Sequence, residues 1–413
     1  MTGATEAMIE TREANATTSR ACPVCDGTTV SWLHAMRFIL PDGHPLVDGY
    51  DIVTCTGCGF VFADTRSTQA DYDRYYADSS KYSDQRTSTG AGVQDWDDDR
   101  LAATARAVAS HLPDRRARIV DIGCANGGLL RWFERMGYER LEGIDPSPAC
   151  VAATGKVPNA SAHVGSLFEL PAAARDADCV ILSHVLEHVR DVGEAVGVLR
   201  RTVRENGLVY VEVPDATRYG DCLVAPFQDF NVEHINHFSP TSLTNVLQRG
   251  GFTVESVGQK TIEASKGVPY PAVWAIARAT TRAGNPASLE FDRTLGSSMA
   301  RYIAASREMV ADLDRYLDHA LAGVDEVVVW GTGQTTLTLL THTRLGGATI
   351  DAFTDSNPVY HGRRLAGRPV VAPEDLGRFG APILIGSLIH QRAITDRIRE
   401  LALPNRVIAL DAE

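Results

Sequence analysis

The amino-acid sequence of 413 residues predicts an α/β protein built on a doubly wound, Rossmann-like parallel sheet. Residues 118–130 read RIVDIGCANGGLL, in which an apolar β-branched run ends at Asp121 in a glycine-rich turn and an amphipathic helix follows. Strand-like and helix-like segments then alternate from residue 101 to about 258. A second strand–GxG–helix opening, DEVVVWGTGQTTLTLL, predicts a C-terminal Rossmann-like domain.

Composition and charge bound the class of protein. The net charge of −12 argues against a general affinity for nucleic acid or anionic membranes. No apolar run of about 18 residues predicts a membrane span, and the acidic, polar N-terminus lacks the apolar core of a secretory signal. We therefore expect a cytoplasmic protein, monomeric or weakly dimeric, with no nucleic-acid or membrane partner. Six segments are predicted: a leader (1–20), a cysteine-rich module (21–64), a tyrosine-rich segment (65–100), the α/β core (101–260), a helical connector (261–322) and the C-terminal domain (323–413).

The cysteine-rich module contains CPVC and, about 30 residues later, CTGC. Each CxxC turn offers two thiolates on one side of a tight loop, and four thiolates satisfy tetrahedral zinc. The spacing predicts a structural Zn²⁺ ion bound by Cys22, Cys25, Cys55 and Cys58.

The tyrosine-rich segment contains Tyr72, Tyr75, Tyr76 and Tyr82. It could be a solvated connector with aromatic anchors, or equally a lid over a nucleoside site.

The second strand of the core ends in Asp145, 24 residues after Asp121. A carboxylate at this strand tip can hold the two hydroxyls of a ribose. Asp145, followed by Pro146 and Ser147, can also cap a helix, and the two roles are compatible. The acid stands before the glycines here, whereas a dinucleotide site would show GxGxxG after the first strand.

VDIGCANGG, GIDPSP and ADCVILSHVLEHVRD together resemble the class I S-adenosylmethionine-dependent methyltransferases. The resemblance implies that Gly123 and Gly127 border the methionine portion, that Asp145 holds the ribose, and that Ser166 and Leu167 flank the adenine. Ala125 replaces the middle glycine of the commonest form. The cofactor-binding residues so implied are Asp121, Gly123, Ala125, Gly127, Asp145, Pro146, Ser166, Leu167 and Ser183.

Nearly the whole chain is similar to the sugar C-methyltransferases, which act on nucleotide-linked 4-keto deoxysugars in antibiotic and polysaccharide pathways. The shared features are the CxxC module, the tyrosine segment, the core, the C-terminal domain and an EHxxxFS motif. That motif is NVEHINHFSP here, with Glu233, His234, Phe238 and Ser239, and the core motif SHVLEHVRD contributes His188.

These residue types suit methylation at carbon. A sugar carbon becomes a nucleophile only when a base removes a proton beside a ketone, and the enolate oxygen then needs a donor. His234 is the predicted base, Glu233 its tuning partner, and His188 the group that faces the enolate oxygen. The predicted substrate-binding residues are Tyr76, Tyr82, His184, Asn231 and His237.

Two departures leave the acceptor atom open. Asn231 stands where a tyrosine is associated with C-methylation, and His184 stands where these enzymes often carry asparagine. An O- or N-methyltransferase is one alternative. Another is an NAD-dependent oxidoreductase that uses the GTGQTT turn and Asp355, although Thr336 replaces the third glycine and a structural or substrate-binding remnant is favoured. The third alternative is a zinc-bearing scaffold protein without methyltransferase activity.

Overall fold

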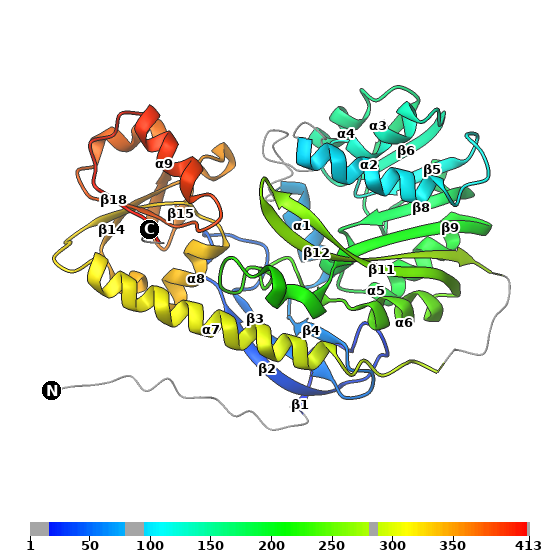
Figure 1. Cartoon of the computed structure of the whole chain (residues 1–413), viewed down its shortest axis with the longest axis horizontal. Coiled ribbons are helices and arrows are strands. Elements are labelled where there is room, and N and C mark those ends of the chain that lie inside the picture. The colour runs from blue at the N-terminus through cyan, green and yellow to red at the C-terminus, as the bar shows by residue number, and fades with distance from the viewer. Residues whose placement is uncertain (1–15, 79–94, 281–287, 411–413) are drawn as a thin grey trace.

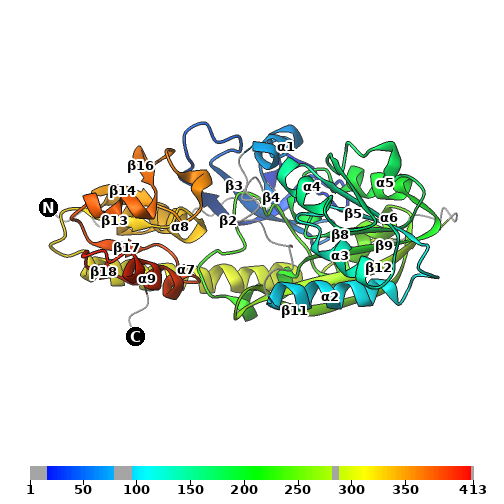
Figure 2. The ribbon, with the colours of Figure 1, turned by 90° about the horizontal axis from the view of Figure 1, so that it is seen from above.

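The computed structural model describes residues 16–78, 95–280 and 288–410. These residues form a seven-stranded, a five-stranded and a six-stranded sheet. Figure 1 shows the seven-stranded sheet and the C-terminal sheet in two lobes, joined along one side by helix α7 (Leu295–Ala320). Viewed from above, the N-terminal strands lie between the lobes (Figure 2). In the described part of the chain, no helix is long and apolar enough to cross a bilayer.

The seven-stranded sheet has the order β11-β12-β9-β8-β5-β6-β7. Its first five strands in the sequence run parallel to one another, whereas β12 is antiparallel to both β9 and β11. The α/β class with a Rossmann-like core is therefore confirmed. Its strands are β5 (Arg118–Ile122), β6 (Arg140–Asp145), β7 (Ala160–Val164), β8 (Ala177–Ser183), β9 (Val203–Pro214), β11 (Phe252–Ser265) and β12 (Val268–Ala279).

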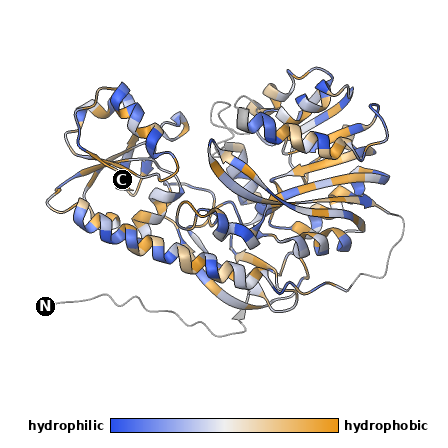
Figure 3. Ribbon diagram, viewed as in Figure 1, coloured by the Kyte–Doolittle hydropathy of each residue, from blue (hydrophilic) through white to orange (hydrophobic). Residues whose placement is uncertain are grey.

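Helices cover both faces of this sheet because its central strands are apolar on both sides. In β8, Cys179 and Ile181 pack with helices α2 and α3, while Val180 and Leu182 pack with α5 and α6. Figure 3 shows the resulting pattern, with hydrophobic residues concentrated on the central strands. The helices are α2 (Asp95–Ala109), α3 (Gly128–Arg135), α4 (Pro148–Thr154), α5 (Val192–Thr202) and α6 (Pro240–Arg249).

The prediction of a helical connector over 261–322 is wrong for residues 261–279, which lie in the β11–β12 hairpin. Pro269 and Pro271 argue against a strand because proline cannot donate to a ladder. The structure accommodates them because β12 pairs with β9 only from Ala272 onward, so both prolines precede that ladder. The helical pattern belongs to α7 alone.

The five-stranded sheet is antiparallel and has the order β1-β2-β3-β4-β10. Its last strand, β10, comes from the middle of the chain and lies between helices α5 and α6 in the sequence. Helix α1 (Gln69–Asp78) follows β4 and leads toward the core. The strands are β1 (Ala16–Thr17), β2 (Thr29–Arg37), β3 (Gly49–Cys55), β4 (Val61–Asp64) and β10 (Asn236–His237).

The C-terminal sheet is parallel apart from β15 and has the order β15-β16-β14-β13-β17-β18. The Rossmann-like form predicted for this domain is present, with α8 (Gln334–His342) directly after the first strand and α9 (Gln391–Glu400) near the end. The strands are β13 (Val327–Trp330), β14 (Ile350–Thr354), β15 (Arg364–Leu365), β16 (Arg368–Val371), β17 (Ile383–Ile385) and β18 (Val407–Ile408).

Candidate active site

A cavity of about 460 Å³ lies at the carboxyl ends of β5, β6 and β8. Its wall also includes side chains from helix α1, from the β11–β12 hairpin and from the segment 228–234. Ligands of parallel α/β sheets bind at this edge, and the volume suits a small molecule.

The glycine-rich turn after β5 is held against β6. The N–H groups of Gly123 and Cys124 donate to the carbonyl of Ile144 at 2.8 and 3.1 Å. Gly123 has φ +79°, and a Cβ there would lie 2.7 Å from Val185 Cγ2. This position therefore requires glycine, and the backbone lines the cavity directly.

The Asp145 carboxylate is fixed by the same turn. Its Oδ2 accepts from the Ala125 N–H and its Oδ1 from the Ser147 N–H, both at 2.9 Å. The side-chain cap of α4 is Ser147, which accepts from the Cys150 N–H. Ser147 rather than Asp145 is therefore the cap of α4, and Asp145 lines the cavity.

Asp121 and Asp145 form a buried acidic pair at this end of the cavity. Burial raises the pKa of Asp121 to about 7, and the charge of Asp145 adds to the effect. Burial also raises the pKa of Asp145. Among the described residues, neither carboxylate forms an ion pair. The pair therefore favours a ligand that brings hydroxyl donors or positive charge.

The remaining predicted cofactor residues fall into two groups. Gly127 does not line the cavity, so its assignment to the methionine portion is corrected. It has φ +72°, and a Cβ there would lie 2.8 Å from Thr154 Oγ1, which makes it a packing glycine. The others line the cavity: Gly123, Ala125, Pro146, Ser166, Leu167 and Ser183.

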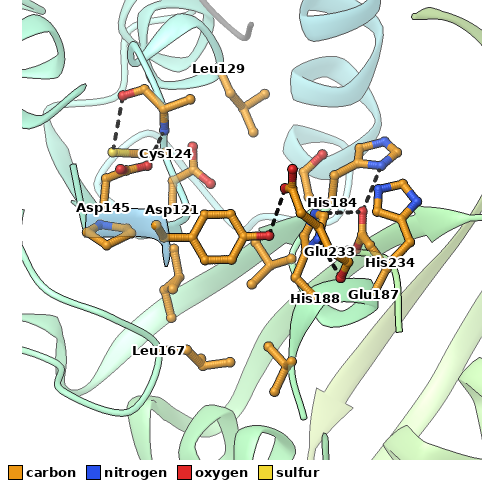
Figure 4. A pocket seen from close by; sticks show the side chains of 18 of the residues that line it. Asp121, Cys124, Leu129, Asp145, Leu167, His184, Glu187, His188, Glu233 and His234 are labelled. Atoms are coloured by element: carbon orange, nitrogen blue, oxygen red, sulfur yellow. Dashed lines mark hydrogen bonds and ion pairs between the residues drawn. The ribbon is translucent and has the colours of Figure 1, made fainter. Parts of the chain in front are cut away.

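His188, Glu233 and His234 lie together at the other end of the cavity (Figure 4). The rings of His188 and His234 are 4.9 Å apart between centroids. His188 Nδ1 lies 3.2 Å from the carbonyl oxygen of Glu233. Because a carbonyl only accepts, Nδ1 carries a proton, and Nε2 gains one only when the ring becomes charged.

The Glu233 carboxylate is held by helix α1. The Tyr75 hydroxyl donates to Oε1 at 2.8 Å, and the Tyr76 hydroxyl donates to Oε2 at 3.0 Å. Tyr76, one of the predicted substrate-binding residues, lines the cavity, whereas Tyr82 lies outside the described residues. The described part of the tyrosine-rich segment is therefore part of the site wall.

Asn231 shapes the turn that carries the motif. Its Oδ1 accepts from the N–H groups of Glu233 and His234, each at 2.9 Å. The Tyr50 hydroxyl in turn donates to the Asn231 carbonyl at 2.7 Å. Asn231 lines the cavity and also fixes the position of the two motif residues.

His184 lines the cavity between two buried carboxylates. Its Nδ1 lies 3.2 Å from Glu187 Oε1, and its Nε2 lies 3.3 Å from Glu212 Oε1. Lys260 Nζ pairs with the other Glu212 oxygen at 2.6 Å. Burial alone would lower the pKa of His184, but the two carboxylates raise it to about 9. The ring is therefore charged at neutral pH, and both nitrogens face protein carboxylates.

The folded protein should lose stability between pH 6.5 and about 9 as His184 releases its proton. Its folded-state pKa is above the ordinary value of 6.5, so this stabilisation is complete below pH 6.5 and lost as the pH rises through about 9. The free energy of unfolding should fall by up to about 3 kcal/mol over this pH range. Urea unfolding at pH 6.5 and at about pH 9 measures this loss of stability, and His184→Gln should remove most of it. Equal pH dependence in both proteins would contradict this assignment.

The assignment of His237 to substrate binding is wrong. His237 is fully buried in β10 and does not line the cavity. Its ring packs 5.1 Å from that of Phe230 and 6.0 Å from that of Tyr219. Burial lowers its pKa to about 3, so the ring stays neutral. His237 is a core residue.

Glu187 and Glu212 are buried carboxylates at the candidate site that were not predicted from the sequence. Glu187 is 1% exposed and lines the cavity, and Glu212 is fully buried behind it. A sequence signal existed for Glu187, because LEHV places it beside His188 just as VEH places Glu233 beside His234. Glu212, inside an apolar strand, carries no comparable signal.

The four cysteines of the two CxxC turns lie together in the N-terminal module. Cys22 Sγ is 3.6 Å from Cys58 Sγ, and Cys25 Sγ is 3.4 Å from Cys55 Sγ. All four sulfurs lie within 4.8 Å of one another. Tetrahedral Zn²⁺ with bonds of about 2.3 Å would separate the sulfurs by about 3.8 Å, so these thiols fit the ion closely.

The GTGQTT turn of the C-terminal domain bonds to itself and to residues that follow two neighbouring strands. Asp355 Oδ2 accepts from the N–H and the hydroxyl of Thr332, at 2.9 and 2.7 Å. The Thr336 hydroxyl donates to the carbonyls of Gly331 and Gly386. These contacts support a structural role for Thr336 in place of the third glycine.

Residues 96–257 match the model of a family described as a methyltransferase domain. Over 110 residues the chain is 34% identical to a ubiquinone biosynthesis O-methyltransferase of Azorhizobium caulinodans, a match that covers 25% of this chain and 43% of that protein. Over 215 residues it is 25% identical to an uncharacterized 37.1 kDa protein in transposon TN4556 of Streptomyces fradiae, covering 49% and 57%. The chain thus spans less than two thirds of the length of either relative.

Solved structures that resemble part of this chain include two bacterial methyltransferases. One is the Burkholderia thailandensis 1,6-didemethyltoxoflavin-N1-methyltransferase with bound 1,6-didemethyltoxoflavin and S-adenosylhomocysteine, at 15% identity and a TM-score of 0.38, covering 55% of this chain and 96% of that one. The other is an S-adenosylmethionine-dependent methyltransferase from Mesorhizobium loti, at 19% identity and a TM-score of 0.36, covering 43% and 99%.

Proposed function

We propose that this chain, whose residues 96–257 match the model of a methyltransferase domain, is a class I S-adenosylmethionine-dependent enzyme that methylates a carbon atom of a nucleotide-linked 4-keto deoxysugar. One observation carries the proposal. A single cavity has an acidic pair at one end, Asp121 and Asp145, and the cluster of His188, Glu233 and His234 at the other (Figure 4). Such a cavity can hold a methyl donor and an acceptor side by side.

The residues at the acidic end fit the methyl donor. Asp145 would bind ribose hydroxyls, Ser166 and Leu167 would flank the adenine, and the backbone at Gly123 would approach the methionine portion. S-adenosylmethionine, when bound, supplies a methyl group on a positively charged sulfur. The buried acidic pair of Asp121 and Asp145 complements that charge.

The histidine end would prepare the acceptor. His234 removes a proton from the carbon next to the ketone, and the electrons of that C–H bond form an enolate. His188 would stabilise the enolate oxygen through its Nε2 once that atom carries a proton, since Nδ1 faces the Glu233 carbonyl. The enolate carbon forms the new C–C bond as the S–CH₃ bond breaks, and the proton on His234 later passes to solvent.

Replacing Asp145 with alanine should weaken the binding of S-adenosylhomocysteine by about 2–3 kcal/mol, because the ribose hydroxyls lose a charged acceptor. Titration calorimetry on the full chain measures this. Asp396→Ala, which alters an exposed carboxylate on α9, is the matched control and should bind as the native protein does. Unchanged affinity in Asp145→Ala would remove the residue from the cofactor site.

Deuterium exchange tests whether the methyl group is transferred to carbon. The full chain is incubated in deuterated water with a thymidine-diphosphate-linked 4-keto deoxysugar and S-adenosylhomocysteine. We expect deuterium to enter the carbon beside the ketone. We also expect methylation of the keto sugar, and not of its 4-hydroxyl analogue, when the methyl donor is present.

O-methylation is the second candidate function. The Azorhizobium relative is named as an O-methyltransferase, and Asn231 and His184 depart from the C-methyltransferase pattern. Methylation of the 4-hydroxyl sugar without deuterium uptake would replace the first proposal with this one.

A further inference from the structure

We propose that Glu187 is the positioning residue of the histidine cluster, the carboxylate that orients His188 and His234 and stabilises whichever ring holds the transferred proton. This rests on the proposed function, because it concerns the same proton transfer. Glu187 does not need to touch the substrate in order to act.

The geometry places Glu187 among three imidazoles. Its Oε1 is 3.2 Å from His184 Nδ1 and 3.7 Å from His188 Nε2. One ligand atom from each of Glu187, His188 and His234 lies within 4.8 Å of the other two. Its second oxygen, Oε2, is buried and has no hydrogen-bond partner among the described residues. A buried carboxylate oxygen without a hydrogen-bond partner is stabilised when a nearby group gains a proton that it can donate.

Backbone contacts lock Glu187 to the segment that carries His234. The Ile235 N–H donates to the Glu187 carbonyl at 2.9 Å. The Asn236 side chain donates to the carbonyls of Leu186 and Val189, at 2.8 and 2.6 Å. The two Glu–His pairs of the sequence, 187–188 and 233–234, are therefore held as one rigid unit.

The two glutamates of this unit have different surroundings. Both oxygens of Glu233 accept hydrogen bonds from tyrosine hydroxyls, which withdraw charge from the carboxylate. Glu187 keeps an unpartnered oxygen and faces His188 Nε2, the atom that gains a proton when that ring becomes charged. A carboxylate beside an imidazole holds its orientation and favours the imidazolium.

A divalent cation is the competing occupant, because Glu187, His188 and His234 could also ligate a metal. His184 opposes this, since its charged ring lies 3.2 Å from the same Glu187 oxygen. A bound cation would face that positive charge directly. The geometry therefore favours proton transfer over metal binding.

The test is a histidine titration by NMR on the full chain with labelled imidazole carbons, in native protein and in Glu187→Gln. His188→Gln and His234→Asn assign the two resonances. Glu187→Gln should lower the pKa of His188 and His234, because it removes negative charge. Tyr76 packs against the His188 ring, the Glu233 carbonyl faces its Nδ1, and His184 faces Glu187; this substitution alters none of these three residues. Glu255→Gln, an exposed carboxylate on β11, is the control and should change neither pKa.

Activity gives a second readout. In Glu187→Gln, deuterium exchange and methylation should both fall about 100-fold, while S-adenosylhomocysteine affinity stays within about twofold. If Glu187→Gln does not fold, Glu187→Asp replaces it in the experiment. Its effects on the histidine pKa values, on exchange and on methylation should have the same direction and be smaller. Unchanged histidine pKa values overturn the inference even in an active enzyme. Broadening of both resonances by equimolar Mn²⁺ overturns it in favour of a metal site. A native enzyme that shows no exchange, with the pKa changes present, defeats only the proposed function.

Discussion

His234→Asn should abolish deuterium exchange and methylation together while S-adenosylhomocysteine binds as before. Asparagine matches part of the ring's shape and keeps a hydrogen-bonding group, but it cannot accept the C–H proton at neutral pH. A positioned general base contributes about 10²–10⁴-fold, so we expect the rate of exchange to fall by at least that lower figure. Cofactor affinity should be spared because the lost interaction belongs to the transition state.

The measurement pairs mass spectrometry of the recovered sugar with calorimetry of the cofactor analogue. His319→Asn, at an exposed position on α7 far from the cavity, is the control and should exchange and methylate at the native rate. Retained exchange in His234→Asn would move the base to another residue, with His188 the next candidate. Retained methylation without exchange would instead support O-methylation.

Cys55→Ser should release the metal and destabilise the chain more than any other substitution considered. We propose one structural Zn²⁺ per chain, bound by Cys22, Cys25, Cys55 and Cys58. Structural zinc contributes about 10–16 kcal/mol of apparent binding free energy in small domains, which is comparable to the whole stability of a protein. Soluble yield should therefore fall steeply, and whatever folds should melt at a lower temperature.

Contacts to the zinc turns explain why the effect should spread. The Asp292 N–H donates to the Cys58 carbonyl at 2.9 Å, and the Ser239 hydroxyl donates to the Asp292 carboxylate. Loosening the second CxxC turn would thus disturb the start of α6 and of α7. Elemental analysis should find about one zinc per native chain and none in Cys55→Ser, whereas Cys222→Ser, at a buried cysteine outside the cluster, should keep it. A metal-free native enzyme with full stability would refute the zinc site.

Local patterns in the sequence were sufficient for the parts of the site that lie on one strand and its following turn. Asp121, Gly123 and Asp145 are found this way, because the end of a parallel strand fixes where the next residues point. The cysteines are also found, because CxxC places two sulfurs on one side of a turn. The described bonds add partners that no spacing reveals, such as Tyr75 and Tyr76 on the Glu233 carboxylate.

The errors arise where tertiary pairing decides the outcome. His234 and His237 look alike in NVEHINHF, but β10 turns His237 into the core while His234 lines the cavity. A two-residue strand has no periodicity to detect. The β12 strand was not predicted; it contains Pro269 and Pro271, which pair with β11 but precede the ladder with β9. Glu187 has a sequence signal in LEHV, but its proximity to His184 and His188 is visible only in the structure.

The position of β10 has a consequence for how this protein can be divided. Asn236 and His237 pair with Phe62 and Val61 of β4, and Arg20 donates through its side chain to Asn236 Oδ1 at 2.6 Å. A gene fragment that begins at residue 95 would leave this strand without its neighbour and expose the apolar face beneath it. We expect such a fragment to aggregate. Transfer of the α/β core into another protein should therefore succeed only when the N-terminal module accompanies it.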